Sequence, residues 1–124
     1  MPHIIIEHSD NFAPQPIIAI AKEIKKILAA IKEGNFDPDQ CKMRSMSYAN
    51  YQVGNCEDPA TFIHVSIKIL SQRPLEIRQK LADQVYNMVY ESYQKLKKHE
   101  SRCDISVDII EMQRETYRKI TIIN

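Results

Sequence analysis

The fold is decided by the segment FIHVSIKIL at residues 62–70, in which apolar and polar positions alternate. The apolar set is Ile63, Val65, Ile67 and Ile69, and the polar set between them is His64, Ser66 and Lys68. Successive side chains of a strand point to opposite faces of a sheet, so a period of two is typical of a half-buried strand. The segment therefore predicts a β-strand with one face toward a core and one more polar face.

A long amphipathic helix is predicted directly after this strand. Pro74 suits the first turn of a helix, where its missing N–H costs no hydrogen bond. From there to Leu96 apolar residues recur at spacings of three and four, which indicates one buried helical stripe. The alternation over residues 103–112 predicts one more strand.

The first half of the chain shows the same order. Residues 2–8 are strand-like and include three consecutive isoleucines. Pro14 and Pro16 precede an apolar helical stripe that ends at Gly34, a residue that often terminates helices. An extended region is expected from about residue 41 to residue 53.

These two halves predict one domain over residues 1–124, made of two β-α-β units at about 2–56 and 60–124. The expected fold class is α/β (α+β), with a four-stranded sheet. Two helices with one apolar stripe each can cover only one face of that sheet. The other face mixes polar residues with Phe62 and Leu70, so we expect it to associate with other copies. A short apolar tail at residues 120–123 is expected to add an edge strand.

Composition and charge exclude several classes of function. The 124 residues include 17 basic and 16 acidic side chains, and the formal net charge is +1. Such a balance provides no broad field for nucleic acid or an acidic membrane. The apolar runs fall short of the roughly 20 residues that cross a bilayer, and no secretory signal pattern opens the chain. We therefore expect a cytoplasmic protein with no nucleic-acid or membrane partner.

The residue types that hold metals or phosphates form no site pattern. Cysteines at positions 41, 56 and 103 show neither metal-ligand pairing nor a disulfide framework, so we expect reduced thiols. The histidines lack a ligand spacing supported by carboxylates; they are His3, His8, His64 and His99. Only two glycines occur, which excludes a phosphate-cradling loop. We therefore expect no metal site and no nucleotide bound through such a loop.

Pro2 is the strongest candidate for chemistry. Removal of Met1 would turn its amide nitrogen into a secondary amine. A free α-amino group titrates at about 7.7–8.0, and an apolar or cationic setting lowers that pKa further. Such an amine can accept and return protons at neutral pH, so Pro2 is a candidate general base.

Arg44 and Arg73 are candidate anion-binding residues. Arg44 lies early in the second extended region, and Arg73 lies between the third predicted strand and the second helix. A guanidinium stays charged and can hold a carboxylate through two parallel hydrogen bonds, or stabilise a developing enolate. A cation near Pro2 would also lower the pKa of its amine.

Five segments spread over nearly the whole chain occur in a familiar order. They are the opening Pro2-His3 with Ile4, Ile6, Glu7 and Ser9-Asp10-Asn11; then Arg44-Ser45; FIHVSIKI at 62–69; RPLEIRQ at 73–79; and TYRK at 116–119. Together they resemble the 5-carboxymethyl-2-hydroxymuconate Δ-isomerases of the tautomerase superfamily. The shared order is more specific than any one motif.

This resemblance implies a homotrimer whose sheets line a central barrel, with the helices outside and an active site near each subunit boundary. It implies a cofactor-independent isomerase that converts a 2-hydroxymuconate dienol to its oxo-ene tautomer during homoprotocatechuate degradation, a branch of aromatic compound catabolism. Pro2 would be the proton-transferring base. Arg44 and Arg73 would bind the carboxylates of this small-molecule substrate and stabilise the oxyanion.

Two positions depart from the family pattern. Met46 stands where an arginine often occurs, and Ile120 replaces a residue that is often polar. The first departure leaves open a related tautomerase that acts on another acidic enol or unsaturated acid. A noncatalytic trimeric binding protein is the alternative from a different class, and a retained Met1 would favour it.

Overall fold

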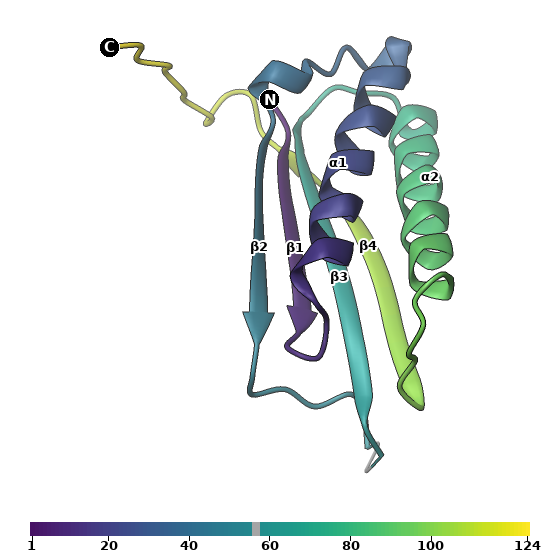
Figure 1. The fold of residues 1–124 in the computed structure, drawn as a ribbon. Coiled ribbons are helices and arrows are strands. Elements are labelled where there is room, and N and C mark those ends of the chain that lie inside the picture. Colours follow the sequence, from purple (N-terminus) through teal and green to yellow (C-terminus); the bar gives the residue numbers. More distant parts are fainter. Residues whose placement is uncertain (56–57) are drawn as a thin grey trace.

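The predicted order of strands and helices is confirmed in the computed structural model of Figure 1, which describes residues 1–55 and 58–124. The first unit contains β1 (His3–Ser9), α1 (Pro14–Ala30) and β2 (Lys42–Tyr48). Two short 3₁₀ helices, η1 (Lys32–Gly34) and η2 (Pro38–Gln40), connect α1 to β2. The second unit contains β3 (Ala60–Leu70), α2 (Leu75–Gln94) and β4 (Arg102–Met112).

The four strands form one mixed sheet in the order β2-β1-β3-β4. Each unit contributes a parallel pair, β1 with β2 and β3 with β4, and the two units meet where β1 runs antiparallel to β3. Both helices lie on the same face of this sheet (Figure 1). The arrangement predicted from two single apolar stripes is therefore confirmed.

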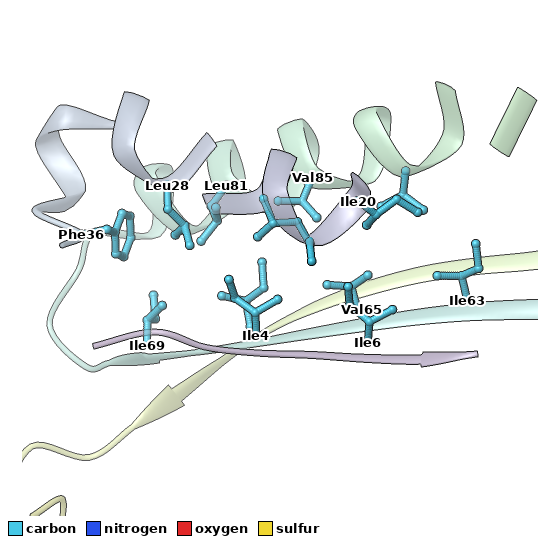
Figure 2. Close-up of a cluster of buried hydrophobic side chains, with 14 of the residues drawn as sticks. Ile4, Ile6, Ile20, Leu28, Phe36, Ile63, Val65, Ile69, Leu81 and Val85 are labelled. Carbon is cyan, nitrogen blue, oxygen red and sulfur yellow. The ribbon is translucent and has the colours of Figure 1, made fainter. Parts of the chain in front are cut away.

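The core forms where the strand alternation meets the helical stripes (Figure 2). Ile4 and Ile6 of β1 lie beside the alternate apolar residues of β3, and all are almost fully buried. The helices contribute Ile20, Ile24 and Leu28 from α1 and Leu81, Val85 and Val89 from α2. Burial of this apolar surface is the main force that holds the helices against the sheet.

The opposite face of the sheet, which we call the open face, is covered by neither α1 nor α2, the two long helices of the described residues. Because Ile4 and Ile6 point toward the helices, His3, Ile5 and Glu7 point to the open face. Directly paired residues share a face, so Arg44 lies on the open face opposite Ile5.

Two expectations about strand extent are wrong. The second strand ends at Tyr48 rather than near residue 53, because its partner β1 ends at Ser9, which pairs with Tyr48. The apolar tail adds no strand: residues 113–124 leave the sheet through a turn in which the Thr116 N–H donates to the Gln113 carbonyl (3.2 Å). Ile120, Ile122 and Ile123 have exposed fractions of 80, 72 and 90%, so the described residues leave them largely uncovered.

Two observations complete the comparison with the sequence. Cys41 and Cys103 are free thiols, whereas Cys56, which was also expected to be reduced, lies outside the described residues. In the described part of the chain, neither helix combines the length and the apolarity that crossing a membrane requires.

Candidate active site

One end of the sheet gathers segments that are far apart in the sequence (Figure 1). β1 and β2 are parallel and both begin there, whereas β3 and β4 run the other way and both end there. The chain N-terminus therefore lies at the edge where β3 ends at Leu70, and Arg73 is in the short connection from there to α2. Two of the three predicted site residues, Pro2 and Arg73, share this end of the sheet.

Pro2 is buried just before the first residue of β1. Its carbonyl accepts a hydrogen bond from the Lys42 N–H at 3.0 Å, which ties the start of the chain to the start of β2. A proline amine exposed by removal of Met1 would thus be held by the sheet rather than on a free end.

The pKa of the Met1 amine shows how burial and nearby charges act just before the start of β1. Burial lowers its pKa below the ordinary value of 8.0, and the positive charge of Arg73 lowers it further. Lys42 acts in the same direction, whereas Cys41 and Asp37 oppose the shift. The setting therefore favours a neutral amine, which is the form that can accept a proton.

Arg73 is held in place by backbone carbonyls. Its Nε donates to the Gly34 carbonyl (2.9 Å), Nη1 to that of Leu70 (3.0 Å) and Nη2 to that of Asn35 (3.3 Å). Its Cζ lies 4.6 Å from the centre of the Phe36 ring, a cation–π distance. A guanidinium has five N–H donors, so these three bonds leave two donors for an anion.

A second arginine, which the sequence did not single out, lies close to Arg73. Arg114 donates from Nε to the carbonyl of Ser71 at 2.8 Å. Burial lowers the pKa of Arg73, and the positive charge of Arg114 contributes to that shift. Arg73 and Arg114 are neighbours because of the register of β3 and β4. Leu70 pairs with Met112, so the chain segments beyond these two residues start side by side. That pairing was the available signal, since parallel strands of one β-α-β unit end at the same edge.

Arg44 is placed differently from the other two candidates. Its side chain is exposed on the open face, and Nη1 lies 3.2 Å from Nδ1 of His3. The positive charges that act on the terminal amine are those of Arg73 and Lys42. Within one chain the structure therefore brings Arg73 close to the terminal amine, whereas Arg44 contacts the side chain of His3.

Comparison with known proteins agrees with this architecture. The sequence profile of the 5-carboxymethyl-2-hydroxymuconate isomerase family matches residues 2–124. No curated protein matches the chain in sequence.

Several solved structures share the fold at low sequence identity. A 5-carboxymethyl-2-hydroxymuconate isomerase from Deinococcus radiodurans R1 is 19% identical with a TM-score of 0.84, over 98% of this chain and 90% of that one. A structure described as a 5-carboxymethyl-2-hydroxymuconate delta-isomerase is 13% identical with a TM-score of 0.82, over 98% and 88%. A fused 4-OT described as a symmetric trimer is 12% identical with a TM-score of 0.64, over 90% and 86%.

At identities this low, the structural matches show the fold alone, which is the tautomerase fold. Membership of the family is shown by the sequence profile. The profile begins at Pro2 and ends at the last residue, so it includes both β-α-β units. This protein is therefore an isomerase that belongs to the 5-carboxymethyl-2-hydroxymuconate isomerase family.

Proposed function

We propose that this isomerase moves a proton within 5-carboxymethyl-2-hydroxymuconate and uses the secondary amine of Pro2, freed by removal of Met1, as its base. The observation that carries the proposal is the setting at the start of β1. Burial and the Arg73 charge lower the pKa of the Met1 amine, one residue before Pro2, and Pro2 is fixed by the hydrogen bond that its carbonyl accepts from the Lys42 N–H.

The proposed reaction needs only proton transfer. The neutral Pro2 amine accepts the proton of the dienol hydroxyl, and the oxygen becomes a carbonyl as the double bonds shift. The ammonium then returns a proton to the carbon at the far end of the conjugated system. The two remaining donors of Arg73 suit a substrate carboxylate or the charge that develops on the oxygen.

Arg44 enters this proposal through assembly. The open face is uncovered in one chain, and a fused 4-OT of the same fold is described as a trimer. We propose a homotrimer built through open faces and sheet edges, in which Arg44 serves a site at a subunit boundary. The exposed guanidinium is already oriented by His3, so it can meet a carboxylate without reorganisation.

Pro2→Ala tests the base directly. Alanine also permits removal of Met1 but leaves a primary amine of different basicity and geometry. We expect kcat to fall by about 10²–10⁴ while the unfolding midpoint stays near that of the parent. Pro16→Ala, in the first turn of α1, is the matched control and should keep full activity. Equal turnover in the two variants would remove Pro2 from the mechanism.

The mass of the intact protein separates this proposal from the noncatalytic alternative. A chain lacking Met1 carries the required amine, whereas a retained Met1 leaves Pro2 as a tertiary amide with no basicity. A retained methionine on the natively expressed chain would favour a trimeric binding protein.

A related tautomerase on another acidic enol is the second candidate, and Met46 favours it. Met46 is 55% exposed on the open face and pairs with Glu7, where an arginine would have added a positive charge. A panel of mono-, di- and tricarboxylate enols compared by kcat/KM distinguishes the two. A preference for the tricarboxylate supports the first reading, and a preference for a smaller acid supports the second.

A further inference from the structure

His3 contacts two functional groups at once. Its Nδ1 lies 3.2 Å from Nη1 of Arg44, and its Nε2 lies 3.0 Å from the hydroxyl of Tyr117. The rings of His3 and Tyr117 meet edge to face, with centroids 6.1 Å apart at 78°. Tyr117 belongs to the segment after β4, and Arg44 belongs to β2. His3, the first residue of β1, therefore connects these two parts of the chain.

The donors and acceptors in this chain permit one protonation state of His3. A guanidinium only donates hydrogen bonds, so Nδ1 must be the acceptor and carries no proton. The ring proton is therefore on Nε2 and is donated to the Tyr117 oxygen. The phenolic hydrogen of Tyr117 is then free to donate to another group.

The charges around His3 support the neutral ring. Lys42 pairs with His3 from β2 and Lys68 pairs with it from β3, and Arg44 lies next to the ring. Burial lowers the pKa of His3 below its usual value, and these three cations and the terminal amine add to the effect. The three ion pairs among the described residues involve none of these three cations. A protonated His3 would add a fourth positive charge and break the contact with Arg44.

We propose that His3 is a positioning residue whose neutral imidazole holds the Arg44 guanidinium and the Tyr117 hydroxyl in place, so that both present donors to the carboxylates of one substrate on the open face. The inference rests on the proposed substrate-binding role of Arg44. The alternative is that His3 only links the segment after β4 to the sheet, in which case its substitution would change stability and not substrate binding.

Two amide substitutions separate the two contacts. Asparagine places its oxygen near the position of Nδ1 and can still accept from Arg44, whereas glutamine reaches the position of Nε2 and retains only the contact with Tyr117. The probe is adipate, a saturated dicarboxylate without an enol, measured as a competitive inhibitor between pH 5 and pH 8. His64→Gln is the control, since His64 lies on the same face and contacts Ser106.

We expect His3→Gln to raise the inhibition constant of adipate about tenfold at pH 7.5 and His3→Asn to change it less than threefold, because a bond to a charged group is lost only in the first. Protonation of the ring should also weaken adipate binding to the parent at low pH, relative to His3→Asn. The titration of adipate itself is common to both proteins and cancels in this comparison.

The outcomes distinguish this inference from the proposed function. If Arg44→Ala weakens binding while both His3 variants match the parent at every pH, the positioning role is wrong and the role of Arg44 stands. If Arg44→Ala binds adipate like the parent, the positioning role of His3 and the substrate-binding role of Arg44 are both wrong. Should His3→Gln unfold, an NMR titration replaces it, and the pKa of His3 must rise when Arg44 becomes alanine.

Discussion

Arg73 occupies a place that a lysine cannot fill. Its guanidinium satisfies three carbonyls from two separate segments and stacks on Phe36. A lysine ammonium is a point charge without the planar fork, so it cannot hold these carbonyls and a substrate carboxylate together. We expect Arg73→Lys to lower kcat/KM by about 10²–10³ in a steady-state assay.

The control for that substitution is Arg102→Lys at the other end of the sheet. Arg102 forms an exposed two-bond ion pair with Asp104, and because an exposed pair contributes only about 0–1 kcal/mol, weakening it should leave the other end of the sheet unchanged. Loss of activity in Arg102→Lys as large as in Arg73→Lys would show a general effect on the fold and contradict the assigned role.

The pH dependence of the reaction should report the charges near the start of β1. The amine must be neutral to act, so kcat/KM falls as pH drops through its pKa. Lys42 lowers the pKa of the Met1 amine and Asp37 raises it, and we expect both charges to act in the same direction on the amine of Pro2. Lys42→Gln should therefore move the acidic limb of the profile to higher pH, and Asp37→Asn should move it to lower pH. Shifts of the same sign in both variants would show that these charges do not act on the base.

At this scale the sequence predicted side chains better than it predicted neighbours. Pro2 and Arg73 could be selected because an imino terminus and a guanidinium have distinct chemistry, and their roles remain predictions. The position of Arg44 beside His3 depends on which face of β2 it occupies, and that follows only from the register with β1. Arg114 was missed because an arginine after a strand has no pattern of its own.

Ile6 shows how an element is fixed by one face. It lies on β1 beside Val65 of β3 and is fully buried under the helices, whereas Ile18 on α1 is 45% exposed. Ile6→Ala should lower the free energy of unfolding by about 2–5 kcal/mol, because it removes buried methyl groups and leaves a cavity. Ile18→Ala should change it by about 0.5 kcal/mol or less. Urea denaturation of both variants at one chain concentration makes the comparison, and equal losses would contradict the assigned core.

The sequence predicted the elements well where periodicity was strong. β3 and β4 alternate over many residues, and α1 and α2 have clear stripes, so these elements were identified with small errors at their ends. The end of β2 was misplaced because it depends on where its partner stops. The apolar tail at residues 120–123 satisfies a strand pattern, but a strand also needs an edge to pair with, and a local pattern contains no information about that.

Among residues 1–55 and 58–124, one sheet face is not covered by a helix and the two edge strands, β2 and β4, each lack a second neighbour. β2 and β4 are each paired on one side only, and the open face carries Ile5 and Met46 among its polar groups. Unpaired edges promote association with other chains, and a closed assembly removes them. This arrangement is the physical basis for the proposed homotrimer.

Assembly through the open face predicts a specific response to added charge. Ser66 lies on the central strand β3, pairs with Ile5, and is only 8% exposed among its neighbours on that face. Ser66→Arg would bring one guanidinium per chain into a shared interface, where repulsion and desolvation oppose association. In sedimentation equilibrium the parent should show three times the 14.5 kDa mass of the chain, and Ser66→Arg should shift toward the monomer and lose activity.

The control is Gln79→Arg, which places the same charge on an exposed position of α2 and should remain trimeric. A monomeric parent, or a trimeric Ser66→Arg, would show that this face is not the interface, and Arg44 would then have no partner subunit to serve.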